Sequence, residues 1–567
     1  MCYNNSMSLN LVKKKNREGK TYVYLVEVYR DKSKVKHRTI ESFGQLEKLE
    51  KDNPNWFEEM KNKVKTGDYE QQEKKELVLR FNLEENITKI EKNFGYKILD
   101  DIFNELKIKE AVKKEYKGKV NLIDILKLLV FERIINPQSK LATVNSQTEL
   151  FGDWNFTQND IYRALEKLEP LVEDIQLTMH KQISKKIGRE ATLVFYDVTN
   201  YYFETDEDDE FRKRGVSKEK RPNPIVQMGL FIDNHGIPIA YKLFPGNNTD
   251  TTTYIPAIKE IKEKFGIERI VVVADKAMNS KKNIKETLEK NDGWIFSQKH
   301  RGTRGAPRDI QEFILNPEGW LYNEELTFAK KSMIREREIE KGITVKEKVL
   351  VTWSKKYAIR EKLRRDGAIE YAEKLTNAEL FRQTAKKGEK KYLELYYFDK
   401  TTGEKLPFIP IIEIDNEQVL FDEQFDGVNV LVASELDMSD EAILEAYGQL
   451  FKIEDCFRIT KSELKSRPIW VRKKESIQSH FLTCFIALTL ERIIEYLIKN
   501  KLSSSKIIKG LRSAVSIELP QGYEMVQGDE NFIQLLNLLK IDFKKKYIEK
   551  EKLTKFSKGW FTTFLNS

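Results

Sequence analysis

The stretch "LVFYDVTNYYFET", residues 193–205, places one carboxylate inside an otherwise apolar segment. Four apolar or aromatic residues lead directly into Asp197, and Thr199 and Asn200 follow shortly after it. Apolar, β-branched and aromatic residues in such a run predict a buried strand. Burial of an ionised carboxylate is costly unless a charge or a metal compensates it. The stretch therefore predicts a strand that leaves the core at Asp197.

A second carboxylate ends another predicted strand. The segment "IERIVVVADKAM", residues 267–278, is a β-branched run that predicts a strand buried on both faces and ending at Asp275. The other elements predicted nearby are strands at 224–233 and 237–246, helices at 250–266 and 279–291, and a short strand at 293–299. This β-β-β-α-β-α-β order predicts an α/β fold with a ribonuclease-H-like core.

Two aspartates at the ends of neighbouring buried strands indicate a divalent-metal site. Carboxylate oxygens suit the hard ions Mg²⁺ and Mn²⁺, which need few protein ligands. A two-metal site for phosphoryl transfer holds its ions roughly 3.5–4 Å apart. Such a site requires a third carboxylate in addition to Asp197 and Asp275.

Glu454 is the best candidate for the third carboxylate. Residues 439–465 predict one long helix with Ser439 as its N-cap. Tyr447, Glu454 and Lys461 are spaced by seven residues and so share one face, with Glu454 half-buried beside the apolar stripe. Arg458 lies four residues beyond Glu454, so an exposed ion pair worth about 0.2–0.5 kcal/mol is the competing interpretation. Spacing alone favours that competing interpretation.

Basic residues are clustered along the chain, whose net charge is +9. Residues 11–40 hold ten Lys or Arg against three acidic residues, and residues 451–475 hold eight against four. Residues 299–308 hold four and no acidic residue. Separate basic clusters are typical of a protein that contacts a polyanion such as nucleic acid. Solubilising lysines are the alternative explanation.

Changes in pattern divide the chain into six predicted regions. They are a basic, β-hairpin-containing region at 1–65, a helical and DNA-binding region at 77–188, a first core segment at 189–299, a β-rich insertion at 300–430, a second core segment with the acidic helix at 431–500, and a C-terminal helical region at 501–567. A polar linker is predicted at 66–76. The amphipathic helix that Pro137 stops and a capping box at Thr157 and Asp160 belong to the helical region.

Composition excludes several other classes of protein. The three cysteines and five histidines are scattered, which argues against a disulfide framework and against a Cys- or His-built metal site. No apolar run approaches twenty residues, and the N-terminus does not resemble a signal peptide. A cytoplasmic protein is therefore expected.

Five motifs together resemble the DDE transposases of bacterial insertion sequences. They are "FYDVTNYYFE", "QMGLFID", "PIAYKLFPGNNTDTTT", "VVVADKAMNS" and "YGQLFKIEDCFRITKSELKSRPIW", in that order. The chain is similar to the branch related to insertion sequence four, whose third carboxylate lies in a Tyr-x2-Arg-x3-Glu-x6-Lys signature after a β-rich insertion. The similarity covers roughly residues 190–500.

This resemblance implies a metal-binding catalytic triad of Asp197, Asp275 and Glu454. It implies that Tyr447 and Lys461 contact DNA phosphates near the cut. The arginine of the signature is Leu450 here, so the corresponding contact is in doubt. The candidates to replace that arginine are Lys452 and Arg458. Some members hold a flipped base with a tryptophan of the insertion, for which Trp320 and Trp353 are candidates beside an ordinary core role.

The implied activity is transposition with Mg²⁺, or Mn²⁺, as cofactor. The protein would bind the inverted repeats at the ends of the element, cleave phosphodiester bonds and transfer the 3′-OH strand into target DNA. A homodimer is expected in the complex with double-stranded DNA, within the bacterial cytoplasm at the nucleoid. One alternative is an inactive or domesticated transposase that only binds DNA. A haloacid-dehalogenase-like phosphotransferase is a further alternative, but Thr199 stands where that motif requires a second aspartate.

Overall fold

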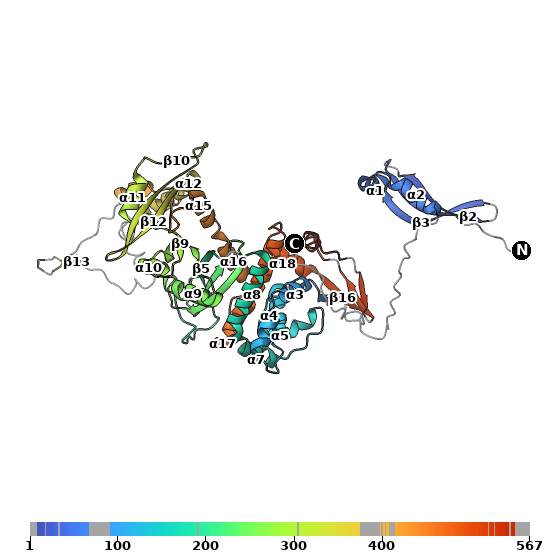
Figure 1. Cartoon of the computed structure of the whole chain (residues 1–567), viewed down its shortest axis with the longest axis horizontal. Coiled ribbons are helices and arrows are strands. Elements are labelled where there is room, and N and C mark those ends of the chain that lie inside the picture. The colour runs from blue at the N-terminus through green and yellow to red at the C-terminus, as the bar shows by residue number, and fades with distance from the viewer. Residues whose placement is uncertain are drawn as a thin grey trace. The chain divides into compact units, whose positions relative to one another are not determined.

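The computed structural model divides the chain into two compact units, Met1–Glu85 and Asn86–Ser567 (Figure 1). The structure describes residues 8–16, 19–31, 34–66, 91–189, 192–302, 306–374, 397–398, 401–402, 404–406, 414–519, 521–526, 528–543 and 546–549. The predicted linker beyond residue 66, residues 303–305 of the basic cluster at 299–308 and parts of the predicted β-rich insertion lie outside these residues.

The first unit is a three-stranded antiparallel sheet followed by two helices. Its elements are β1 (Ser8–Lys15), β2 (Thr21–Asp31), β3 (Lys34–Gln45), α1 (Leu46–Asp52) and α2 (Trp56–Thr66). The predicted basic hairpin is confirmed, because β2 pairs with β3 in antiparallel register. Leu11, Val23, Leu25 and Phe57 form its small core, and Lys13 lies over the ring of Phe57 at 3.8 Å. One exposed lysine of the basic cluster therefore covers an aromatic ring of this unit.

The second unit is built on a nine-stranded mixed sheet. Its first elements are β5 (Leu193–Tyr202), β6 (Ile225–Ile232), β7 (Pro238–Pro245), α9 (Asp250–Phe265), β8 (Val271–Ala274), α10 (Lys281–Glu289) and β9 (Gly293–Ser297). Strands β5, β8 and β9 are parallel, whereas β6 runs antiparallel to β5 and β7 in turn runs antiparallel to β6. The predicted α/β class and the predicted order of elements are confirmed.

Four strands of the insertion extend the same sheet, and two others pair with each other. The elements here are α11 (Arg308–Leu315), β10 (Leu321–Tyr322), β11 (Phe328–Glu340), β12 (Ile343–Ser354), α12 (Lys355–Lys374), β13 (Tyr397–Phe398), β14 (Lys405–Leu406), α14 (Asn416–Glu423) and β15 (Val428–Ala433). The sheet order is β10-β11-β12-β15-β9-β8-β5-β6-β7, whereas β13 and β14 form a separate two-stranded sheet. Strand β15 pairs with β9 and β12 pairs with β15, so this part of the insertion is continuous with the core.

Helices cover both faces of the sheet. On one face, Tyr196 and Val198 of β5 join a core that includes residues of α9, α10 and α11. On the other face, Phe195 and Tyr201 join a larger core with the surrounding helices. Alternation of side chains along β5 accounts for this division, since successive residues point to opposite faces.

The larger core is centred on α17 (Lys474–Leu497). It packs against α5 (Leu122–Ile135), α7 (Gln158–Leu168) and the sheet (Figure 1). Among the described helices, α17 alone is long and apolar enough to cross a membrane, but 94% of its apolar window is buried inside the protein. A helix that is apolar nearly all round is typically a core helix, which agrees with this burial.

The helical region before the sheet shares this core. Its elements are β4 (Glu91–Asn93), α3 (Tyr96–Glu105), α4 (Ile108–Glu115), α5, α6 (Lys140–Ser146), α7 and α8 (Val172–Ile187). The predicted capping box is confirmed at the start of α7. The prediction of an amphipathic α5 was wrong, because Glu132 and Arg133 are buried along with its apolar residues. Neighbouring helices and α17 surround α5, so it lacks a broad solvent face.

Strands as well as helices follow α17. The elements are α18 (Ser504–Ser513), β16 (Val515–Leu519), β17 (Gly522–Met525), α19 (Glu530–Leu538) and β18 (Tyr547–Glu549). They form a four-stranded sheet in the order β18-β17-β16-β4. The beginning and the end of this unit are thereby joined by backbone hydrogen bonds.

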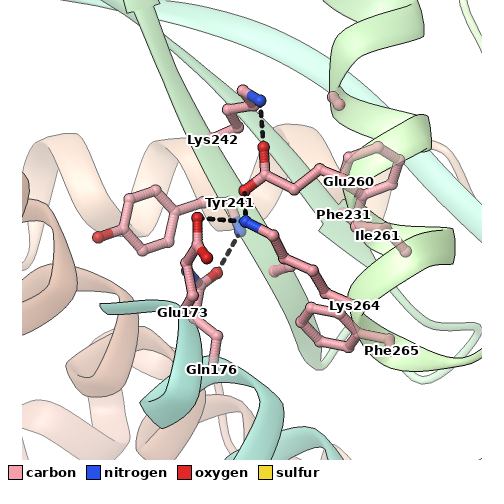
Figure 2. A pocket seen from close by; sticks show the side chains of 11 residues that line it. Glu173, Gln176, Phe231, Tyr241, Lys242, Glu260, Ile261, Lys264 and Phe265 are labelled. Carbon is pink, nitrogen blue, oxygen red and sulfur yellow. Dashed lines mark hydrogen bonds and ion pairs between the residues drawn. The ribbon is translucent and has the colours of Figure 1, made fainter. Parts of the chain in front are cut away.

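A chain of ion pairs links α8, β7 and α9 (Figure 2). Lys242 pairs with Glu260, and Lys264 bridges Glu260 and Glu173. The backbone N–H of Tyr241 donates to Gln176 Oε1 at 2.8 Å. The hollow between these residues measures about 10 Å³, which is room for about one water molecule. This cluster therefore holds a helix to the sheet and is not a ligand site.

His180 is expected to make the protein sensitive to acid. It lies on α8 against Arg189, and burial followed by the charge of Arg189 lowers the pKa of its imidazole from 6.5 to about 4. Between these pH values the unfolded chain binds a proton that the folded chain excludes, so stability is lost as pH falls from 6.5 towards 4. Urea unfolding of wild type and His180→Gln at pH 7 and pH 5 should show a smaller acid loss in the variant. An equal loss in both proteins would contradict this assignment.

Candidate active site

The register of the sheet brings Asp197 and Asp275 together. Strands β5 and β8 are parallel, and the last residues that pair between them are Phe195 and Val273. Each aspartate lies two residues beyond that pair, so the two are level along neighbouring chains. Residues two apart on a strand point to the same face, and Phe195 and Val273, two residues before the aspartates, belong to the larger core. Both aspartate side chains therefore point to the face covered by α16 and α17.

The sequence predicted that the strand ends at Asp197, but β5 continues beyond this residue. It continues to Tyr202 because Thr199, Tyr201 and their neighbours still pair with β6. The parallel neighbour β8 ends at Ala274, which uncovers this part of β5 on one side. Asp197 is therefore half-buried in mid-strand, at the point where the adjacent strand stops.

Local hydrogen bonds orient both carboxylates. The backbone N–H of Val198 donates to Asp197 Oδ1 at 2.7 Å. Asp275 Oδ1 accepts from the N–H of Lys276 at 2.7 Å and from the hydroxyl of Ser297 at 2.9 Å. Ser297 ends β9, so three neighbouring strands contribute to this edge. Sequence reasoning missed Ser297, although its place at the end of a predicted strand was a usable signal.

The helix that carries Glu454 is broken. The structure has α15 (Asp440–Gly448) and α16 (Phe451–Ser462) instead of the single long helix predicted. Between them the N–H groups of Leu450, Lys452 and Ile453 bond three residues back, as in a 3₁₀ turn. Gly448 favours the break because glycine is a poor helix former. Ser439 is the N-cap of α15, as predicted.

Tyr447 connects Glu454 to Asp275. Burial raises the pKa of the Tyr447 phenol, a hydrogen bond with Ser297 opposes this shift, and the charges of Asp275 and Glu454 raise the pKa further. Both carboxylates therefore act electrostatically on the Tyr447 phenol. Glu454 is exposed on α16, whereas the heptad argument predicted it to be half-buried.

Lys461 lies on the other side of the carboxylates, near Asp197. Its Nζ donates to Thr199 Oγ1 at 2.6 Å and lies 3.5 Å from Glu219 Oε1. Burial, and then the charge of Lys218, lowers the pKa of Lys461 to about 8, while Asp197 acts in the opposite direction. A cation thus stands beside Asp197, and Tyr447 stands beside Asp275.

Lys452 and Arg458, the candidates to replace the missing arginine of the signature, pair with residues other than the three carboxylates. Arg458 is exposed and pairs with Asp455 at 2.7 Å, not with Glu454. Lys452 donates to the carbonyl of Asn234 at 2.6 Å, in the turn between β6 and β7. Both cations are already occupied by protein partners. Leu450 lies in the turn between α15 and α16.

A hollow of about 540 Å³ adjoins the carboxylate edge. Its walls come from the second half of β5, the connection between β5 and β6, the start of α9 and Ala277. Arg214 and Lys218 line it, and Lys218 donates to the carbonyl of Val198 at 2.6 Å. Sequence reasoning missed these cations, although the run "RKRGVSKEKR" at 212–221 is strongly basic.

The two tryptophans proposed for base binding belong to the second core. Trp320 and Trp353 are half-buried and pack against the sheet. Lys331 Nζ lies 4.5 Å from the ring of Trp320. Their positions agree with the alternative of ordinary packing roles.

The donor set fits a hard divalent ion, but it is not a preformed cluster. Asp197, Asp275 and Glu454 offer only carboxylate oxygens, the ligands that suit Mg²⁺ and Mn²⁺. Among the residues that the structure describes, no three His, Cys, Asp or Glu side chains already stand in a metal-binding arrangement. Glu454, on a separate helix beyond Tyr447, would have to approach the two aspartates.

Sequence families agree with an acidic centre on such a sheet. The profile of the family described as "Transposase DDE domain" matches residues 189–490, which include β5, β8 and α16. The chain belongs to this family and is a DDE transposase of an insertion sequence. Residues 9–73 match the family described as "IS1634 family transposase, N-terminal domain". The Tyr-Arg-Glu-Lys signature stays a prediction.

Two solved transposases have some structural similarity to the chain. The piggyBac transposase, in a synaptic complex with hairpin DNA, has a TM-score of 0.36 and 10% identity over 83% of this chain and 85% of its own. The Mos1 transposase, in a paired-end complex with the left transposon end, has a TM-score of 0.14 and 12% identity over 31% and 60%. Both similarities are low. No curated protein matches the sequence.

Proposed function

We propose that Asp197, Asp275 and Glu454 form the centre at which this transposase cleaves the ends of its element. The observation that carries the proposal is the shared register of Asp197 and Asp275, and it is supported by the effect of the Asp275 and Glu454 charges on the pKa of Tyr447. We further infer a ribonuclease-H-like core, because the sheet contains the order β7-β6-β5-β8-β9 with three parallel strands.

The three carboxylates would hold Mg²⁺ or Mn²⁺ ions. Divalent ions bound there would activate the attacking oxygen and stabilise charge on the reacting phosphate. This chain orients the acceptors: Val198 holds Asp197, while Lys276 and Ser297 hold Asp275. Such preorganisation lowers the reorganisation needed during reaction.

Cationic and phenolic groups would position the DNA. Lys461 beside Asp197 and Tyr447 beside Asp275 flank the carboxylates, which suits contacts to phosphates on either side of the cut. Arg214 and Lys218 line the adjoining hollow and suit further contacts along the strand. Cleavage would free a 3′-OH, which then attacks target DNA. Joining two ends at once calls for a homodimer in the DNA complex, formed in the bacterial cytoplasm at the nucleoid.

DNA cleavage by the purified full chain tests this function. The substrate is a duplex carrying the DNA that bounds this reading frame, and the control is a duplex of equal length with scrambled ends. We expect cuts at the element ends with Mg²⁺ or Mn²⁺ and none with EDTA, because neutral water is a poor nucleophile without a metal. Products on a sequencing gel give the positions. Equal cutting of scrambled ends, or cutting in EDTA, would contradict the proposal.

A further inference from the structure

A second, strongly basic cavity lies away from the carboxylates. It measures about 140 Å³ and lies between the end of α5, the start of α6, the connection after α16 and one turn of α17. Its charged and aromatic lining residues are Arg133, Lys140, Lys465, Arg467, Trp470 and His480. No acidic residue lines it.

Two of its cations are buried without a counter-charge. Lys140 is 4% exposed and Arg133 is 5% exposed. Lys140 Nζ and Arg133 Nε have no hydrogen-bond partner in the described part of the chain. The remaining nitrogens of Arg133 donate to backbone carbonyls, such as that of Gln138 at 3.1 Å. Within that same part of the chain, neither cation forms an ion pair with a carboxylate.

The other groups at the cavity do not neutralise this pair. Arg467 is already paired with Glu219, and Lys465 is exposed at the rim. His480 is buried and lies 3.0 Å from the carbonyl of Ser466. Burial lowers the pKa of its imidazole well below 6.5, so His480 is neutral. The excess positive charge inside the cavity therefore comes from Arg133 and Lys140.

Such a pair is costly in the absence of an anion. Removing an ammonium group from water carries a large penalty unless an opposite charge repays it. Burial, and then the charge of Arg133, lowers the pKa of Lys140 to about 7. A bound anion would offset the cost of burying the charge and would raise the pKa of Lys140, because an opposite charge favours the protonated lysine.

We propose that this cavity binds a phosphate group of the DNA. Its volume of about 140 Å³ suits a single phosphate, and lies below the ~300–1,000 Å³ of most pockets for whole small molecules. Trp470 is 63% exposed at the cavity and offers a face on which a neighbouring base can stack. Lys465 follows Lys461 by four residues, in the connection after α16, so the cavity would extend the DNA path from the carboxylate edge. The identity of the ligand as DNA rests on the proposed function, whereas phosphate binding does not.

Inorganic phosphate tests the cavity independently of DNA. The full chain is heated in phosphate or in chloride at matched ionic strength, with EDTA present. Wild type should gain several degrees more from phosphate than Lys140→Met, since a ligand that binds only the folded state raises its melting temperature. Without phosphate, Lys140→Met should melt higher than wild type, because it lacks an unpaired buried charge. An equal phosphate gain in both proteins would overturn the proposal.

DNA binding in EDTA identifies the source of the phosphate. Lys140→Met should weaken duplex binding and lower the slope of log affinity against log salt by about 0.9. The matched control, Lys109→Met, removes an exposed lysine on α4 and should leave both unchanged. If the deficit of Lys140→Met appears only on a nicked duplex with a 5′-phosphate, the ligand is a terminal phosphate. A deficit that is equal with a 5′-hydroxyl indicates an internal phosphodiester.

Two rim variants guard against misfolding of Lys140→Met. Lys465→Ala and Trp470→Ala change exposed side chains and should each weaken binding severalfold without lowering the melting temperature. Normal DNA binding by both rim variants and by Lys140→Met would overturn the proposal. Because cleavage is not measured, loss of the proposed catalytic function would leave these results unaffected.

Discussion

Replacement of Asp197 or Asp275 by asparagine is expected to abolish metal-dependent DNA cleavage while DNA binding persists. Asparagine keeps the shape of the side chain and an oxygen that can accept from Val198 or from Ser297. It removes the negative charge that a divalent ion requires. Loss of one member of a group that acts as a unit typically costs about 10⁴- to 10⁶-fold in rate. Single-turnover cleavage rates and filter binding measure the two effects separately.

Glu454→Gln should show the same loss, and Glu445→Gln provides its matched control. Glu445 is exposed on α15, whereas Glu454 lies on α16 near Tyr447. We expect Glu445→Gln to cleave at the wild-type rate. Normal cleavage by Glu454→Gln would remove it from the triad, and normal cleavage by either aspartate variant would refute the proposed centre.

Asp233→Ala is expected to produce the largest loss of stability. Asp233 Oδ2 accepts from Arg189 Nε at 2.6 Å, and both side chains are fully buried. Its Oδ1 also accepts from the N–H groups of His235 and Ile237 in the turn before β7. Removing one partner of a buried ion pair costs about 3–5 kcal/mol because the other charge is left unpaired. Urea unfolding of the full chain measures the loss.

Asp233→Asn separates the two roles of this side chain. It keeps an acceptor for the turn but lacks the charge that pairs with Arg189, so its loss should be smaller than that of Asp233→Ala. Glu204→Ala is the surface control, since Glu204 and Arg221 lie 3.5 Å apart and are exposed. Its effect should stay within about 0.5 kcal/mol. A comparable loss in Glu204→Ala would show that burial of the Arg189–Asp233 pair is not decisive.

The two aspartates of the site could be predicted from the sequence because each interrupts an apolar run. The turn between β6 and β7 and the helix that ends at Gly266 follow from equally local signals. Glu454 was less secure, since spacing along a helix does not distinguish a metal ligand from an exposed ion pair. The resemblance of the surrounding motif to that of DDE transposases identified Glu454, whereas its position on the helix did not.

Other features depend on contacts between distant segments. The persistence of β5 beyond Asp197 depends on pairing with β6 after β8 has ended. Gly448 is only a weak local signal of the break between α15 and α16, because a single glycine is tolerated inside a helix. Arg133 and Lys140 meet Lys465 and Trp470 only in the folded chain, so no local pattern in the sequence indicates their cavity.

Anomalous diffraction from manganese tests the central claim most directly. Crystals of the full chain with cleaved end DNA would be prepared with Mn²⁺, and crystals of Asp275→Asn would serve as the comparison. The proposal predicts manganese density bridging Asp197 and Asp275, with Glu454 as a further ligand, and its loss in the variant. Manganese bound elsewhere, with these three carboxylates unligated, would contradict it.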